Sequence, residues 1–490
     1  MDPEVRRASR GVLFGSSRAA VWGALFWIAC SAAARGQSSQ DPAPTPPPSP
    51  EKPAGQEPPP RPNPAPGAPG DVPAQNELTL EDWSLHFQAT AVSQGHGAFS
   101  AKYSGVHSLS DKGENEMSFT STLFLGRRLW EGGALYLNPE VSGGSGLSGT
   151  TGLAAFPNGE ITRVSVEKPI PYVARLYLEQ TVDLGGADQK VEPGPNQLAG
   201  HTSDMHLTLR AGKFSAVDMF DDNKYSHDPR EQFLNWALMD NGAWDYPADT
   251  RGYTGGLAAE LELKEWTLRY GFFLMPKFAN GLPIDFTFQD AHGQAIEVDH
   301  AHVFLDRPGT LRAMIYINHA DMGKYRETID NPAQNMDITL SRGRDRMKYG
   351  FTLSGEQEFT DDLGAFFRAG WNDGKTESFA FTEIDRTFTL GAALKGTGWQ
   401  RPQDTIAAAL VVNGLSPDHA AYLAKGGHGF IIGDGALHYA PETLIETYYQ
   451  VVFKENLALT FDYQFVANPG YNRDRGPVPG IWAIRVHVTF

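Results

Sequence analysis

The sequence predicts an all-β protein, a transmembrane antiparallel β-barrel of roughly 16 strands with short helices in long loops. Three observations lead to this prediction. From about residue 80 onward, apolar and polar residues alternate in segments of strand length. Short and long gaps between these segments alternate along the chain. The last segment, IWAIRVHVTF, ends on an aromatic residue, Phe490.

The first 36 residues have the character of an export signal. MDPEVRRASRGVLFGSSRAA carries four arginines and is followed by the apolar run AVWGALFWIAC and the small residues SAAARGQ. A basic region, a short apolar region and small residues at a cleavage site define a secretory signal peptide. The only cysteine, Cys30, lies in the apolar run. We therefore expect residues 1–36 to be removed, which leaves an exported chain without a thiol.

Proline dominates the next segment, residues 37–79, which includes DPAPTPPPSPEKPAGQEPPPRPNPAPGAPG. Such a composition forms neither a core nor a sheet ladder. We expect a disordered periplasmic linker here, followed by one barrel domain over residues 80–490.

Composition excludes several classes of function. The net charge of −17 argues against nucleic-acid binding. GSGLSG at residues 144–149 matches a dinucleotide-binding pattern, but no helix signal follows it. No pair of carboxylates has the spacing of a glycoside hydrolase, and no nucleophile or zinc motif is present. We therefore expect no enzymatic activity, no cofactor and no metal site.

The lengths of the gaps separate a barrel from a soluble sandwich. KYGFTLSGEQEF meets LGAFFRAGWN through TDD, GGLAAELEL meets WTLRYGFFL through residues 264–265, and QAIEVDHAHVF meets TLRAMIYIN through DRPG. The long segments between such pairs are residues 142–171, 214–254, 275–293, 319–346, 372–385 and 414–441. Outer-membrane barrels have tight periplasmic turns and long extracellular loops, whereas a sandwich has no reason to sort its connections in this way.

Alternation also assigns side chains to the two faces of the barrel. In WTLRYG, Trp266, Leu268 and Tyr270 share one face and Arg269 the other. A mid-strand arginine facing lipid costs about 2–4 kcal/mol, so the arginine face must point inward. The same rule places these candidate lumen residues inward: Arg210, Arg269, Arg312, Arg368, Glu446, Asp462, Gln464 and Arg485. Each of them alone also fits a wet polar face with no solute role.

The third long loop, residues 214–254, carries the least usual pattern. In SHDPREQFLNWALMDNGAW, Asp228 and Pro229 can start a helix that Gly242 ends. Phe233 and Trp236 would share one face of it. An external loop has little reason to carry an apolar face, so we expect this loop to fold into the lumen and narrow it. SPDHAAYLAKGG predicts a second capped helix in the loop 414–441.

Several long motifs resemble the carbohydrate-selective porin (OprB) family of Gram-negative bacteria. They are GLSGTTGLAAFPNGE, QFLNWALMDNGAWDYPADTRGYT, GWNDGKTESFAFTEIDR and NPGYNRDRGPV, and the resemblance runs from about residue 80 to 490. It implies a sugar-permeable outer-membrane barrel of 16 strands, with a narrow eyelet lined by arginines and carboxylates. Matched by motif, the eyelet residues would be Asn235, Trp236, Asp249, Arg251, Asn468, Arg473 and Arg475.

The expected function is therefore passive, selective diffusion of mono- and oligosaccharides across the outer membrane. The expected partners are carbohydrate solutes, outer-membrane lipid and lipopolysaccharide, and the insertion machinery that recognises a terminal aromatic such as Phe490. A general small-solute porin, a surface-polysaccharide-binding barrel without transport and a soluble secreted sugar-binding protein remain as alternatives. Monomer and trimer both remain open.

Overall fold

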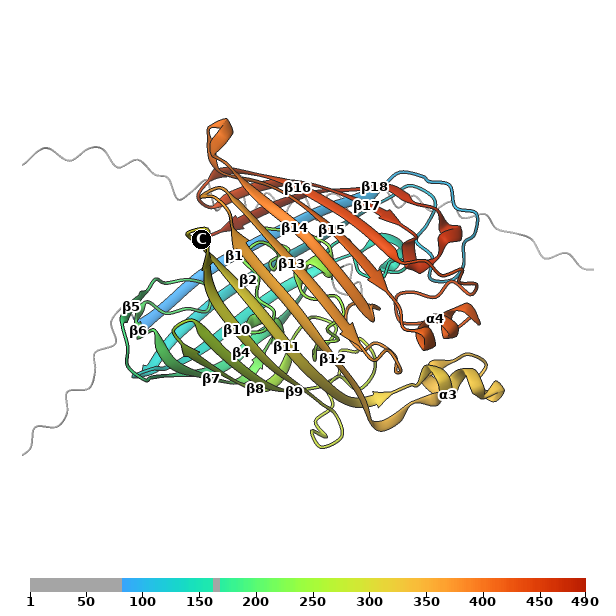
Figure 1. Ribbon diagram of the computed structural model, residues 1–490, viewed down its shortest axis with the longest axis horizontal. Coiled ribbons are helices and arrows are strands. Elements are labelled where there is room, and N and C mark those ends of the chain that lie inside the picture. Colours follow the sequence, from blue (N-terminus) through green and yellow to red (C-terminus); the bar gives the residue numbers. More distant parts are fainter. Residues whose placement is uncertain (1–81, 162–167) are drawn as a thin grey trace, which may run out of the picture. The chain divides into compact units, whose positions relative to one another are not determined.

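The structure, a computed structural model, describes residues 82–161 and 168–490. The signal peptide expected at residues 1–36 and the linker expected at 37–79 lie outside the described residues. Within the described part, sixteen strands close into one antiparallel barrel, in which β1 pairs with β18 (Figure 1). The predicted fold class and strand number are confirmed.

Each barrel strand pairs with the preceding and the following barrel strand in the chain. The barrel strands are β1 (Trp83–His96), β2 (Glu114–Trp130), β3 (Gly133–Gly144), β4 (Ile170–Asp183), β7 (Met205–Phe214), β8 (Thr254–Leu263), β9 (Trp266–Leu274), β10 (His292–Phe304), β11 (Arg307–Met322), β12 (Gly343–Glu358), β13 (Leu363–Asn372), β14 (Arg386–Gly396), β15 (Arg401–Gly414), β16 (Glu442–Lys454), β17 (Leu457–Ala467) and β18 (Val478–Thr489). Because the ring is closed, no strand edge is left unpaired, as the interior of a bilayer requires.

The two faces of the strands follow the alternation in the sequence. On β9, Trp266, Leu268 and Tyr270 are exposed on the outside of the barrel, whereas the Arg269 side chain is only 12% exposed. The closing strand places Trp482 and Ile484 outside, and Arg485 buried inside. The apolar face therefore meets lipid and the polar face meets the lumen.

The two ends of the barrel differ in the length of their connections. At one end the turns span residues 131–132, 264–265, 305–306, 359–362, 397–400 and 455–456. At the other end lie eight loops, which we call L1 (97–113), L2 (145–169), L3 (215–253), L4 (275–291), L5 (323–342), L6 (373–385), L7 (415–441) and L8 (468–477). In outer-membrane barrels the short-turn end faces the periplasm. The turn expected at DRPG lies one residue earlier, at residues 305–306, because Arg307 already pairs with Phe304.

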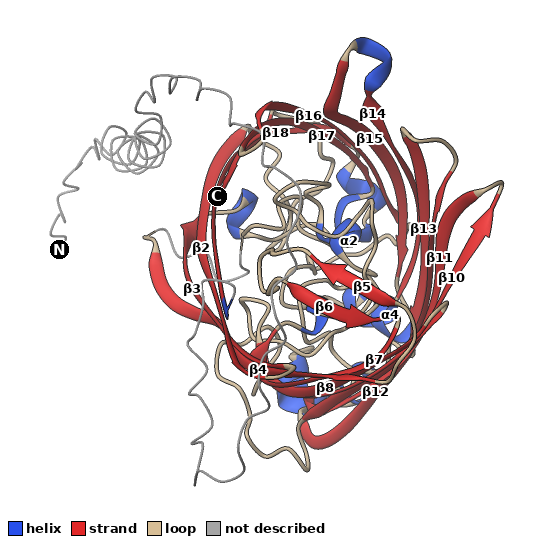
Figure 2. Cartoon of the chain, turned by 90° about the vertical axis from the view of Figure 1, so that its left-hand side faces the viewer, coloured by secondary structure: helices blue, strands red, loops and turns tan. Residues whose placement is uncertain are grey.

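One connection at the periplasmic end departs from the expected alternation. Residues 184–204 form a hairpin of β5 (Asp188–Val191) and β6 (Gly200–Ser203), which lies across the barrel opening in Figure 2. Leu198 of this connection is buried in the main core, and Asn138 Nδ2 donates to Asn196 Oδ1 at 2.8 Å. The sequence pattern gave no sign of this inward fold.

The helices are short and lie in the loops. They are α2 (Trp236–Met239), α3 (Tyr325–Asp330) and α4 (Pro417–Ala424), with the 3₁₀ turns η2 (Leu147–Gly149), η3 (Ala216–Asp218), η4 (Pro332–Gln334), η5 (Ile338–Ser341), η6 (Thr397–Trp399), η7 (Pro469–Tyr471) and η8 (Arg473–Arg475). The prediction for α4 is confirmed, since Ser416 Oγ accepts from the His419 N–H at 3.0 Å. Among the described residues, no helix has the length and apolar character needed to cross a bilayer.

L3 folds into the barrel, as expected, but its helix is much shorter than the sequence indicated. The Asp228 carbonyl accepts from Glu231 and Gln232 N–H groups in one isolated turn. A continuing helix would also use the N–H groups of Leu234 and Asn235, but these donate to the Glu446 carboxylate. The helix therefore starts only at Trp236, where Asn235 Oδ1 caps it by accepting from the Ala237 N–H.

Candidate pore constriction

A cavity of about 180 Å³ lies inside the barrel between L3 and the wall formed by β2, β3 and β4. The wall contributes Thr120, Glu140, Ser142, Tyr172 and Arg175, and L2 contributes residues 159–161. L3 contributes residues 227–230 and 250–253 together with Trp236, and L6 adds Phe381. The cavity is thus bounded by the barrel wall on one side and by the folded loop on the other.

L3 takes this position because it is also anchored to β12, β13 and β18. The Arg368 guanidinium of β13, which is fully buried, contacts Asp221 Oδ2 at 3.0 Å and donates to the Leu238 carbonyl at 3.1 Å. Arg485 of β18 donates to the Pro229 and Gln232 carbonyls, both at 2.6 Å.

Two further contacts complete this anchoring. The Lys348 ammonium of β12 lies 2.9 Å from Asp245 Oδ2. That carboxylate also accepts from the backbone N–H groups of Phe379 and Ala380, which ties L3 to L6. Buried ion pairs with satisfied hydrogen bonds hold a loop in one geometry.

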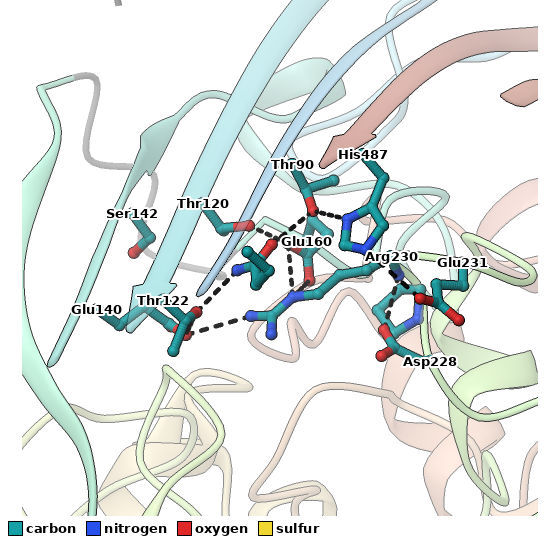
Figure 3. Close-up of polar contacts among 12 residues, drawn as sticks. Thr90, Thr120, Thr122, Glu140, Ser142, Glu160, Asp228, Arg230, Glu231 and His487 are labelled. Atoms are coloured by element: carbon teal, nitrogen blue, oxygen red, sulfur yellow. Dashed lines mark hydrogen bonds and ion pairs between the residues drawn. The ribbon is translucent and has the colours of Figure 1, made fainter. Parts of the chain in front are cut away.

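Arginines and carboxylates face each other across the cavity (Figure 3). The Arg230 guanidinium of L3 donates to Glu160 at 3.1 Å and 3.2 Å, and to Glu140 at 3.2 Å. On β4, the strand next to β3, the Arg175 guanidinium makes a bidentate pair with Asp218, with N–O distances of 2.7 and 2.6 Å. Each of these five groups has a neighbour of opposite charge, so this part of the cavity wall is strongly polar while the charges largely compensate one another.

These ion pairs also set the protonation states of the two L3 residues Arg230 and Asp218. Burial alone lowers the pKa of Arg230, but the Glu160 and Glu140 charges outweigh it and hold that pKa well above its ordinary value. Burial likewise raises the pKa of Asp218, yet the adjacent Arg175 brings the net shift below the ordinary value. Both groups therefore stay charged at neutral pH.

Arg251 differs from the other two arginines of the cavity. Its guanidinium lies 4.2 Å from the centre of the Tyr172 ring, and in the described part of the chain it has neither an ion pair nor a side-chain hydrogen bond. Asp249 stabilises the turn that presents it, since Asp249 Oδ1 accepts from the N–H groups of Arg251 and Tyr253. Among the described residues, therefore, none accepts from the five guanidinium N–H donors of Arg251, which lines the cavity.

Aromatic rings form another part of the cavity wall. Tyr246 stacks on Phe381 with ring centres 4.7 Å apart, and Trp236 meets the same ring edge-on at 4.7 Å. All three residues line the cavity. The site therefore combines hydrogen-bonding groups with flat apolar faces.

The sequence-based candidates fall into three groups. Arg251 and Trp236 line the cavity, while Asp249 and Asn235 hold the backbone beside it. Arg368, Glu446, Gln464 and Arg485 lie inside the barrel as expected, but they are buried against L2 or L3 and position those loops. Asp462, also buried, accepts from Gln464 Nε2 at 3.1 Å.

The remaining candidates lie elsewhere in the lumen and loops. Arg210 pairs with Glu179 at 2.6 Å, Arg312 pairs with Glu356 at 3.0 Å, and Arg269 contacts three carboxylates of β8 and β10. These arginines form ion pairs along the inner wall. Asn468, Arg473 and Arg475 instead tie L8 to the backbones of L7 and L1, through Pro441, Tyr439 and Leu109.

Sequence reasoning missed Glu140, Glu160, Tyr172, Arg175, Asp218 and Arg230. Arg230 stands in the loop stretch expected to enter the lumen, so its charge was a usable signal. Arg175 was hidden by a β-bulge: Arg175 pairs with Asn138 and Val173 pairs with the next residue, which leaves Ala174 as the extra residue. The bulge shifts the alternation by one, so Tyr172 and Arg175 both line the cavity despite their opposite parity.

The chain was compared with known families, sequences and structures. Residues 107–490 match the family described as "Carbohydrate-selective porin, OprB family". The high-pH structure of Pseudomonas putida OprB aligns at a TM-score of 0.64 and 14% identity, over 84% of this chain and 94% of that one. The outer membrane channel DcaP of Acinetobacter baumannii aligns at a TM-score of 0.44 and 9% identity, over 83% and 96%. No curated protein sequence matches the chain.

Proposed function

Because the chain belongs to the carbohydrate-selective porin (OprB) family and is an outer-membrane carbohydrate porin, we propose that sugars cross it by passive diffusion through the cavity between L3 and β2–β4. The observation that supports this path is the arrangement of the cavity wall. Paired charges, a stacked arginine with free donors and three aromatic rings converge on one opening inside the barrel.

The chemistry of a sugar matches this wall. A pyranose carries hydroxyls around a ring whose C–H faces are apolar. The Arg251 donors and the Glu140 and Asp218 oxygens exchange hydrogen bonds with hydroxyls, while Trp236 and Phe381 offer flat surfaces to the ring. Several moderate contacts also allow release, which a channel requires.

The same wall disfavours free passage of ions. An ion of either sign meets Arg175 paired with Asp218 and Arg230 paired with Glu160, and these compensated pairs attract neither sign strongly. A neutral polyol gives up less hydration free energy than an ion when it enters such a constriction. We infer selectivity for carbohydrates over size-matched ions from this balance.

Export and insertion complete the proposal. Residues 1–36 act as the signal peptide, residues 37–79 act as a periplasmic linker, and the terminal Phe490 is read by the insertion machinery. Phe490 exchanges two backbone hydrogen bonds with Phe87 at 2.9 Å, while its ring stays about half exposed. Deletion of Phe490 should lower the amount of folded barrel in the outer membrane, measured by fractionation, without changing the amount exported.

Swelling of proteoliposomes tests the transport path. Arg251→Ala should slow the entry of glucose and larger sugars or change their ranking, because a donor that faces the cavity is lost. Arg326→Ala is the matched control, since Arg326 pairs with Asp418 on the exposed surface of L5. Equal permeation of sugars and size-matched ions would instead indicate a general porin. Planar bilayers without channel steps would indicate a polysaccharide-binding barrel.

A further inference from the structure

A second cavity lies inside the barrel at its periplasmic end. Its volume is about 210 Å³, and it shares no lining residue with the pore constriction. It is enclosed by L3 residues 224–232 on one side and by the inner wall of β13–β16 on the other. Asp361 and Asp362 of a periplasmic turn and Lys395 at the end of β14 mark its outer rim.

Segment 224–232 separates the two cavities. Residues 227–230 line the constriction, whereas Lys224, Tyr225, Glu231 and Gln232 line the second cavity. Figure 3 shows Arg230 reaching toward Glu160 while the neighbouring Glu231 points the other way. The segment is rigid because Gln232 Oε1 accepts from the His227 N–H at 2.6 Å and Gln232 Nε2 donates to the Lys224 carbonyl at 2.8 Å.

Two tyrosines give this cavity its chemistry. Tyr448 of β16 is 4% exposed and packs edge-on against Phe233, with ring centres 5.0 Å apart. Its hydroxyl, like that of Tyr225, has no hydrogen-bond partner within residues 82–161 and 168–490. Both tyrosines line the cavity, so each hydroxyl can donate to, or accept from, a hydroxyl of a ligand there.

The charges at this cavity select against anions. Glu231, Glu358, Asp361 and Asp362 line it against two lysines, Lys224 and Lys395. Lys224 is already paired with Glu358, and Arg307 neutralises Asp361 from outside the lining. The Glu231 carboxylate lies 3.5 Å from His487 Nε2 but stays more than half exposed, so it keeps oxygen lone pairs that can accept from hydroxyl groups.

We propose that this cavity is a second carbohydrate site, which binds a neutral sugar on the periplasmic side of the constriction and rejects acidic sugars. The inference rests on the proposed function, because the sugar arrives through the constriction. Tyr225 and Tyr448 supply hydroxyl donors, and Glu231 supplies an acceptor. A solute that leaves the constriction thus meets a weak binding site before it reaches the periplasm.

Protection of an engineered thiol tests the site directly. Thr405 lines the cavity and has a side chain close to cysteine in size, so Thr405→Cys is introduced together with Cys30→Ser. Glucose at twice its Kd should slow labelling by a thiol reagent about threefold, in proportion to occupancy. Gluconate should give no protection. The matched control is Thr287→Cys in the exposed loop L4, whose labelling glucose should leave unchanged.

Variants of the tyrosines link the protection to the proposed contacts. Tyr448→Phe keeps the ring and should weaken glucose protection about 3- to 10-fold, the effect of one lost hydrogen bond. Gly364→Ala should act similarly, because an added Cβ would lie 2.0 Å from Tyr225 Cζ and displace that ring. Tyr349→Phe on the lipid-facing side of β12 is the control for loss of a tyrosine hydroxyl.

The outcomes separate this site from the transport path. Unchanged labelling of Thr405→Cys in glucose, or equal protection by gluconate, would overturn the second site even if wild-type proteoliposomes swell in sugar. Protection without swelling would support the site and refute sugar transport. Protection that is unchanged in Arg251→Ala but weakened in Tyr448→Phe is the expected result.

Discussion

Loss of the Arg368 side chain should loosen L3 without unfolding the barrel. Arg368 extends from β13 into the barrel and holds L3 at two points, the carboxylate and carbonyl of Asp221 and the carbonyl of Leu238. The three distances are 3.0–3.1 Å, and the side chain is fully buried. Arg368→Met keeps an unbranched side chain, which is shorter than that of arginine, and removes the charge and all donors.

The size of the effect follows from the Asp221 carboxylate, which stays buried without its partner. Removing one partner of a buried ion pair costs about 3–5 kcal/mol, because the other charge stays buried without compensation. At about 1.4 kcal/mol per factor of ten, this corresponds to roughly two to three and a half orders of magnitude in the equilibrium between the anchored and the loosened loop. Arg485, Glu446 and Lys348 still anchor other parts of L3, so the loop should move near residues 221 and 238–239 and stay in the lumen.

Single-channel recording in planar bilayers measures the effect. We expect Arg368→Met to raise the mean conductance and the current noise, and to reduce discrimination between sugars and ions. Heat-modifiable migration in detergent gels should stay normal, because the backbone pairing of β13 with β12 and β14 does not involve this side chain. Arg326→Met is the matched control, with an exposed pair that contributes about 0–1 kcal/mol.

A double variant tests whether the unpaired Asp221 carboxylate causes the loosening of L3. Asp221→Asn added to Arg368→Met removes the uncompensated carboxylate and should recover part of the wild-type conductance. Asparagine fits this position because the φ of Asp221 is 53°, a conformation that asparagine tolerates. Conductance and noise that stay at wild-type values in a folded Arg368→Met protein would refute the reasoning.

Three further predictions concern the loops. Asn235→Ala removes the cap of α2 and the bond to Gln464 at 3.1 Å, and should cost about 1 kcal/mol and increase cleavage of L3 by added protease. Arg175 lowers the pKa of Asp218 against the effect of burial, so the stabilisation of L3 by this pair is present above the ordinary pKa of 3.8 and is lost as the pH falls through the lower folded value. Acid titration of conductance should show this change in wild type and not in Asp218→Asn, and identical titrations would contradict it. Leu198→Ser should expose residues 184–204 to protease because it removes the side chain that packs in the core, whereas Lys190→Ser in the exposed β5 should not.

The sequence predicted the barrel well because a membrane imposes a simple rule on every strand. Trp266, Leu268 and Tyr270 had to face lipid and Arg269 had to face water, so alternation alone assigned both faces. The number of residues between successive strands was equally informative, because tight turns are short and extracellular loops are long. The α4 helix was predictable because Ser416 and Pro417 form a local start signal.

The site was predicted only in part, because its geometry depends on contacts between distant residues. Arg251 and Trp236 were found through their motifs, and both line the constriction. Arg368 and Arg485 had the correct parity, but burial under L3 makes them anchors. Parity cannot distinguish an arginine that faces water from one covered by a loop that returns to the wall.

The sequence by itself determined the closed barrel, the direction of its faces and the presence of L3 in the lumen. The barrel and its faces follow from the two-residue period and the gap lengths, and the placement of L3 follows from the apolar residues in that loop. Only the tertiary structure decided which strands anchor L3 and where the bulge at Ala174 shifts the alternation so that Arg175 lines the cavity. It also decided how residues 184–204 fold across the periplasmic end. Each of these depends on pairing energies between segments far apart in the chain, such as Asp221 with Arg368, and no local pattern encodes them.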